Sequence, residues 1–276
     1  MNPRVRRISY LFLCAFPFLE LVVTGARPLR AAGLFQVVGV VQFIAVAIAA
    51  WVVGLRSISL QAEGPGQLAL AGSLLMLPFG VVSLLWVGIG APFQATLSEN
   101  YMRFLVLVWD SILITVGFVV LKDALYGAGE RFYATVGLAA ALIAGAAYLI
   151  CLNLSLAQVA MVIRGDKTPL PSLLGHFYGA IEFVACVMTY AATAMFATAM
   201  SRVRLLGRSP ALGYVTASAI LVALLVVRGL EYPEISASTA PWYTQPGVIA
   251  GIPAIPWFMP TLLGVVLLRR AGEARS

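Results

Sequence analysis

The sequence predicts an all-α fold, a polytopic bundle of about eight helices that span a membrane. Two observations predict it. Hydrophobic residues make up 61% of the 276 residues and charged residues only 11%, whereas soluble domains carry about 25% charged residues. The apolar residues also form long runs, and a membrane-spanning helix needs about 20 of them. This composition excludes a soluble enzyme, a disordered chain and a disulfide scaffold.

Eight apolar segments are long enough to span a bilayer. They cover residues 8–26, 33–54, 67–90, 103–121, 132–163, 177–200, 211–227 and 247–268. The connections between them are short, contain Gly, Pro, Ser or charged residues, and are too small to hold a separate domain. We therefore expect one integral membrane domain over residues 1–276.

Two of these segments have unusual features, a charged residue in one and excess length in the other. Segment 8–26 follows three arginines, as a signal peptide does, but Glu20 interrupts the apolar run, so we expect a retained first helix. Segment 132–163 would measure about 48 Å as a helix, which exceeds the roughly 30 Å hydrocarbon core. It must tilt, project from the bilayer, or break near Asn153.

The distribution of cations predicts the orientation. With the N-terminus in the cytoplasm, twelve of the 18 Lys and Arg residues fall on the cytoplasmic side and six on the external side. Such a bias favours cytoplasmic placement of both termini. We therefore expect an integral protein of the bacterial inner (plasma) membrane, and we expect its cations to lie at membrane surfaces rather than on nucleic acid.

Three carboxylates interrupt the apolar segments, and each is costly inside a membrane, by about 2.5–3.5 kcal/mol. Glu20, Asp110 and Glu182 lie at a similar distance, about 8–10 Å, from the external ends of their expected segments. Further polar residues fall in the same half of the bundle. The candidate ligand-binding set is Glu20, Asp110, Glu182, Arg228, Asn153 and Gln42.

Two sequence patterns support a pocket in that half. Glu182, Cys186, Thr189 and Thr193 are spaced by four, three and four residues, so they form one polar stripe that must face protein or water. Three prolines, at positions 253, 256 and 260, prevent a regular helix in the outer part of segment 247–268. Irregular backbone at membrane depth is tolerated where it lines a cavity or is buried in protein.

These observations predict a carrier of a small molecule or an ion, with a polar pocket in the outer half of the bundle. The first alternative is a non-catalytic subunit of a larger membrane complex, for which the ridge of Gly137, Ala141 and Gly145 would bind a partner or a second copy. The second alternative is a lipid-modifying enzyme capped by the loop 231–247. The single histidine, His176, and the absence of nucleotide-binding and hydrolase motifs predict no catalytic residues, metal or cofactor. Membrane lipid is the expected partner.

Overall fold

The chain is all-α in the part that the structure, a computed structural model, describes. Described are residues 3–25, 34–58, 64–89, 95–166, 172–230, 250–251 and 255–274. The helices are α1 (Pro3–Gly25), α2 (Leu34–Val53), the 3-10 helix η1 (Leu55–Ser57), α3 (Pro65–Ile89), α4 (Leu97–Gly127), α5 (Phe132–Ile163), α6 (Ser172–Arg202), α7 (Arg208–Leu230) and α9 (Phe258–Glu273). Each of the eight expected segments overlaps one of these α-helices, which confirms the helical bundle.

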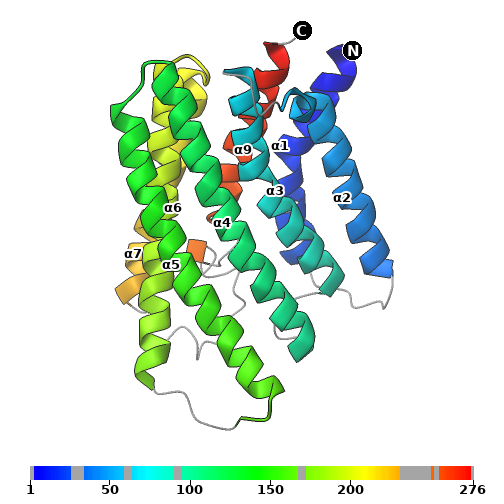
Figure 1. The fold of residues 1–276 in the computed structure, drawn as a ribbon, viewed down its shortest axis with the longest axis vertical. Helices are drawn as coiled ribbons and strands as arrows, with labels where there is room; N and C mark the ends of the chain where they lie inside the picture. Colours follow the sequence, from blue (N-terminus) through cyan, green and yellow to red (C-terminus); the bar gives the residue numbers. More distant parts are fainter. Residues whose placement is uncertain are drawn as a thin grey trace.

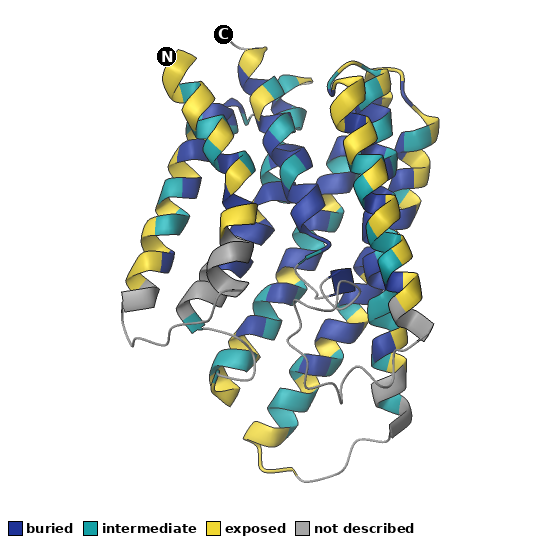
Figure 2. Cartoon of the chain, turned by 180° about the vertical axis from the view of Figure 1, so that it is seen from behind, coloured by how far each residue is buried: buried dark blue, intermediate teal, exposed yellow. Residues whose placement is uncertain are grey.

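The helices run up and down the bundle, so that both chain termini lie at one end (Figure 1). We call this the termini end. Along the chain α2 packs on α3, α3 on α4, α4 on α5, α5 on α6 and α6 on α7, while α9 returns to pack against α3. The buried residues concentrate where α3, α4, α5, α6 and α9 face one another (Figure 2). The core is therefore continuous across the middle of the bundle.

The outer surface is apolar, as a membrane protein requires. Within the described residues, five helical stretches are long and apolar enough to cross a bilayer: Pro65–Ser83, Leu97–Gly127, Phe132–Ile163, Phe177–Arg202 and Arg208–Val227. Helix α2 exposes an apolar stripe at heptad spacing. This stripe consists of Val37, Val41, Ile44, Ile48 and Trp51. Exposed apolar faces of this size are covered by lipid or protein rather than water, and the chain is an integral membrane protein.

Helix α5 has the bounds that the sequence predicts and does not break at Asn153. The Asn153 amide donates to the carbonyl of Leu149, four residues earlier at 2.7 Å, so the side chain is satisfied within its own helix. The small-residue ridge of α5 is used inside the chain. A β-carbon on Gly145 would meet the Thr115 side chain of α4, and one on Gly137 would lie 3.0 Å from Phe196 of α6.

Several helices begin earlier than expected, and at α4 and α6 the helix extends by five or six residues past the apolar run. At the start of α4, the Thr96 backbone N–H donates to Glu99 Oε2 at 2.6 Å, and the Glu99 N–H donates to Thr96 Oγ1 at 3.3 Å. This reciprocal capping box satisfies two helix N–H groups that would otherwise lack partners. Helix α4 therefore starts at Leu97 rather than Arg103, and α6 starts at Ser172 rather than Phe177.

The prolines of the last segment delay its helix, as expected. Residues Ile255–Trp257 form a bend and turns, and α9 begins at Phe258. Pro260 lies in the first turn of α9, where a missing N–H costs no hydrogen bond. Pro253 lies outside the described residues.

Candidate functional site

Asp110 is the most deeply buried carboxylate among the described residues. It is the fourteenth residue of the 31-residue helix α4 and is only 2% exposed. Its Oδ2 atom is buried and has no hydrogen-bond partner. A buried carboxylate oxygen without a partner is expensive in any protein and more so in a membrane span. Such a group is therefore a default candidate for a binding site.

The helical register places Asp110 on the face of α4 that packs against α3. Gly117, seven residues later, lies on the same face, and a β-carbon there would lie 2.9 Å from Leu75 of α3. Asp110 thus lies two turns farther from the termini end on that face. Its neighbour Ser111 points toward α5, where it lines a cavity.

This cavity lies in the core between α4, α5, α6 and the residue just before α9, Trp257. Its volume is about 10 Å³, close to the smallest space that holds one water molecule. The residues lining it are Ser111, Ile114, Thr115, Phe118, Ala141, Ala144, Gly145, Tyr148, Thr189 and Trp257. One lining residue, Ser111, follows Asp110 in the sequence, but Asp110 itself is not among the residues that line the cavity.

The hydroxyl groups around the cavity present acceptors to an occupant. Ser111 Oγ donates to the Val108 carbonyl at 2.7 Å, and Thr115 Oγ1 donates to the Ser111 carbonyl at 2.8 Å. Thr189 Oγ1 likewise donates to a backbone carbonyl of its own helix, at 2.8 Å. Each hydroxyl has only one hydrogen to donate. Its remaining lone pairs therefore suit a donor such as water, or a cation.

Next to this cavity, α6 holds the backbone that leads into the proline-containing segment. Tyr190 Oη donates to the Ala250 carbonyl at 3.0 Å, and Cys186 Sγ lies 3.7 Å from the Gly251 carbonyl oxygen. Cys186 Sγ also lies 3.7 Å from Tyr148 Oη of α5. Carbonyls that a helix does not satisfy need such partners when they are buried. These side chains therefore join α5 and α6 to residues 250–251.

The polar stripe of α6 faces protein, as the spacing predicts. Cys186, Thr189 and Thr193 are all buried, and Glu182 is half-buried. Thr193 Oγ1 donates to the Thr189 carbonyl at 2.9 Å. Cys186 Sγ is in contact with Tyr148 Oη of α5, and Thr189 lines the cavity together with residues of α5. The stripe therefore lies in the α5–α6 interface.

The other candidates from the sequence lie in different helix interfaces. Gln42 Nε2 of α2 donates to Ser83 Oγ of α3 at 3.3 Å, whereas Asn153 is exposed on α5. Glu20 and Arg228 belong to α1 and α7, and their side chains lie outside the described residues. Helix α1 packs against α2 and α9, while α6 packs against α5 and α7. The helices that carry Glu20 and Glu182 are thus on opposite sides of the bundle (Figure 1).

The three carboxylates lie at different distances along their helices from the helix ends opposite the termini end. At about 1.5 Å per residue, Glu20 lies about 7.5 Å from the end of α1 at Gly25. Glu182 lies about 15 Å from the start of α6 and Asp110 about 20 Å from the start of α4, again at about 1.5 Å per residue. The difference arises because α4 and α6 extend beyond their apolar runs.

Sequence reasoning missed several residues of this region. Arg103 was expected at the edge of a span, but it is only 4% exposed within α4, and its Nη1 donates to Asn100 Oδ1 at 2.8 Å. The Thr96-x-x-Glu99 capping box would have moved the start of α4 outward and Arg103 into the helix. Tyr148 and Tyr190 were harder to identify from the sequence. The one indication was that a buried tyrosine hydroxyl usually has a hydrogen-bond partner.

Comparison of the chain with protein-family models, with curated proteins and with solved structures gives no match. Within the described residues, no group of three or more His, Cys, Asp and Glu side chains is placed to hold a metal ion. The loop 231–247, which the enzyme alternative requires, lies outside the described residues.

Proposed function

We propose that the chain is a membrane carrier in which Asp110 binds a proton or a small monovalent cation near the middle of the bundle. The observation that carries this proposal is the buried, unpartnered Oδ2 atom of Asp110. A carboxylate that remains ionised at this position needs a positive partner, and a carboxylate that is protonated has a hydrogen to donate. Binding a cation would offset the cost of burying the ionised carboxylate, and binding a proton would remove its charge.

The core next to Asp110 supports a small cargo, where the following residue, Ser111, lines a cavity that Asp110 itself does not line. The neighbouring cavity, with a volume of about 10 Å³, accommodates about one water molecule. The hydroxyl oxygens that line it keep lone pairs for a water or a cation, because their hydrogens are donated to backbone carbonyls. An organic cargo would require the helices to separate. Binding of a proton or a dehydrated cation requires no such movement.

The subunit alternative loses one of its supports. The ridge of Gly137, Ala141 and Gly145 on α5 packs against α4 and α6 of the same chain, so it is occupied before any partner binds. The proposal retains the bacterial inner membrane and cytoplasmic termini. Their support is the excess of Lys and Arg at the termini end.

Ion flux in proteoliposomes tests the proposal. The purified chain is reconstituted with a pH-sensitive dye inside, and proton, Na⁺ and K⁺ gradients are imposed in turn. We expect flux of at least one of these ions in the wild type, loss of it in Asp110→Asn, and retention in Asp123→Asn, which removes an exposed carboxylate at the termini end.

Two results would count against the proposal. The first is unchanged flux in an Asp110→Asn variant that elutes as a folded protein. The second is no flux in the wild type together with a stoichiometric partner polypeptide in native mass spectra of gently extracted membranes. The second result would support the subunit alternative instead.

A further inference from the structure

The termini end of the bundle carries far more cations than carboxylates. Its described cations are Arg4, Arg6, Arg7, Arg56, Lys122, Arg131, Arg202, Arg204, Arg208, Arg269 and Arg270, and its described carboxylates are Asp123, Glu130 and Glu273. These residues lie at the ends of helices that meet at the top of Figure 1. The surface of this end is therefore strongly positive.

The carboxylates at this end are already engaged by neighbouring cations. The ion pairs are Lys122–Asp123 at 3.1 Å, Arg202–Glu130 at 2.7 Å, Arg269–Glu273 at 2.8 Å and Arg270–Glu273 at 3.0 Å. By contrast, Arg7, Arg56, Arg204 and Arg208 are exposed and form no ion pair with a described residue. Their charges are available to an anion from outside the chain.

Tyrosines at this end indicate the level of the lipid headgroups. The Arg269 guanidinium lies 4.7 Å from the ring centroid of Tyr10, and Lys122 Nζ lies 4.3 Å from that of Tyr126. Arg202 lies 5.4 Å from the ring centroid of Tyr133. Tyrosine is enriched where a membrane protein crosses the interface between hydrocarbon and water. The exposed arginines at the same end of the bundle are therefore near headgroup height.

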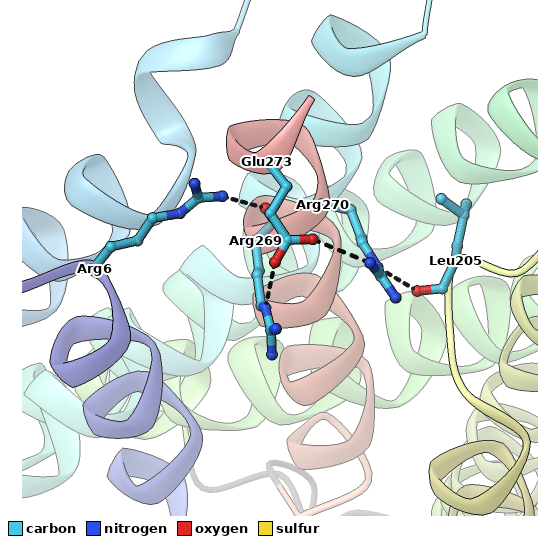
Figure 3. Close-up of polar contacts among 5 residues, drawn as sticks. All are labelled: Arg6, Leu205, Arg269, Arg270 and Glu273. Atoms are coloured by element: carbon cyan, nitrogen blue, oxygen red, sulfur yellow. Dashed lines mark hydrogen bonds and ion pairs between the residues drawn. The ribbon is translucent and has the colours of Figure 1, made fainter. Parts of the chain in front are cut away.

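The connection between α6 and α7 holds an arginine where glycine is favoured. Arg204 has a φ of 62°, and the following Leu205 N–H donates back to the Met200 carbonyl at 2.9 Å, as in a Schellman turn. Arg270 Nε of α9 donates to the Leu205 carbonyl at 2.8 Å and fixes the connection against α9 (Figure 3). A β-carbon is disfavoured in this conformation. The turn would form more easily with glycine. The arginine at this position therefore suggests that its positive charge has a role in binding.

We infer that the termini end binds anionic phospholipid headgroups, with Arg204 and Arg208 at the centre of the binding surface. A guanidinium group matches the geometry of a phosphate and forms two parallel hydrogen bonds with it. The surface offers this chemistry at the height where phosphodiesters of the bilayer lie. The inference does not depend on transport through the Asp110 site.

Lipid binding to the purified full chain tests the inference. Native mass spectrometry in detergent, with phosphatidylglycerol or phosphatidylcholine added, measures the affinity for each lipid. We expect preferential binding of phosphatidylglycerol, which weakens with salt. Each arginine removed should lower the affinity about fivefold, so Arg204→Gln with Arg208→Gln should lower it about twenty-fivefold. Arg164→Gln, which removes an exposed arginine at the opposite end, is the matched control and should leave the affinity unchanged.

A second variant separates lost binding from misfolding. Arg204→Gly removes the charge and relieves the backbone, so it should unfold at the same temperature as the wild type or higher and still bind phosphatidylglycerol about fivefold more weakly. Equal binding of the two lipids, or wild-type affinity in the double variant, would overturn the inference. Displacement of the lipid by millimolar inorganic phosphate would also overturn it, because it would indicate a site for free phosphate.

Discussion

The crossing of α3 and α9 is one of the close backbone contacts that glycines of the bundle create, and it makes Gly264→Ala a demanding test of the packing. A β-carbon on Gly264 would lie 2.6 Å from the Gly72 carbonyl oxygen and 3.0 Å from the Met76 nitrogen. Both atoms belong to the backbone of α3, so they cannot rotate away as a side chain would. The two helices must instead separate by about 1 Å, which loses dispersion contacts on both sides.

The expected cost follows from this geometry. Overpacking of a rigid core costs about 1–3 kcal/mol, while the exchange of glycine for alanine within a helix contributes about 0.5–1 kcal/mol of stability in the opposite direction. We therefore expect Gly264→Ala to lower the free energy of unfolding by about 1–2 kcal/mol. Titration with a denaturing detergent, followed by the loss of helical signal, measures this quantity.

Gly80→Ala is the matched control, because Gly80 is also buried and lies on α3, the helix against which Gly264 packs. A β-carbon at that position would lie 3.9 Å from Val46 Cγ1, an ordinary contact. This variant should be as stable as the wild type or more stable by up to about 1 kcal/mol. If Gly264→Ala were as stable as Gly80→Ala, the close approach of α3 and α9 would be refuted.

Two further predictions concern polar contacts. Tyr190→Phe leaves the Ala250 carbonyl without its donor and should lower the free energy of unfolding by about 1–2 kcal/mol, whereas Tyr101→Phe, on the exposed surface of α4, should have no measurable effect in the same titration. Burial raises the pKa of Glu273, but the hydrogen bond and charge of Arg269, together with the second arginine partner, outweigh it and hold the pKa below its ordinary value. The stabilisation of the folded protein by the ion pairs of Glu273 is therefore complete above the ordinary carboxylate pKa of about 4.3. It is lost as the pH falls through the lower pKa of Glu273 in the folded protein. The midpoint temperature of thermal unfolding should accordingly be higher in the wild type than in Glu273→Gln at neutral pH, and the difference should vanish in acid. A difference that does not change with pH would show that the ion pairs of Glu273 are not its cause.

Much of the fold was predictable because a membrane restricts the chain to few solutions. Backbone polar groups must be satisfied within a span, so long apolar runs become helices. Helix α5 was predicted to the residue because Arg131 and Arg164 flank its apolar run directly. Helix α4 was predicted six residues too short at its start, because apolarity reports the hydrocarbon core and not the capped turn beyond it.

The candidate site was less predictable, because it depends on which helices are neighbours. The spacing of Cys186, Thr189 and Thr193 correctly indicated a face of α6 that is turned toward protein. No comparable spacing pattern in the sequence indicates the order of the helices around the bundle. It therefore could not separate Asp110, which lies in the core, from Glu20, whose helix packs on the other side of α9 from that core.

Infrared difference spectroscopy of the carboxyl groups in the reconstituted protein tests directly whether Asp110 binds the proton or cation. Spectra are recorded as the pH is changed and as Na⁺ or K⁺ is exchanged for a large organic cation, in the wild type, Asp110→Asn and Asp123→Asn. We expect a carboxyl band that responds to protons or to the small cation in the wild type and in Asp123→Asn, and that is absent from Asp110→Asn. Identical responses in all three proteins would contradict the assignment of Asp110 as the binding group.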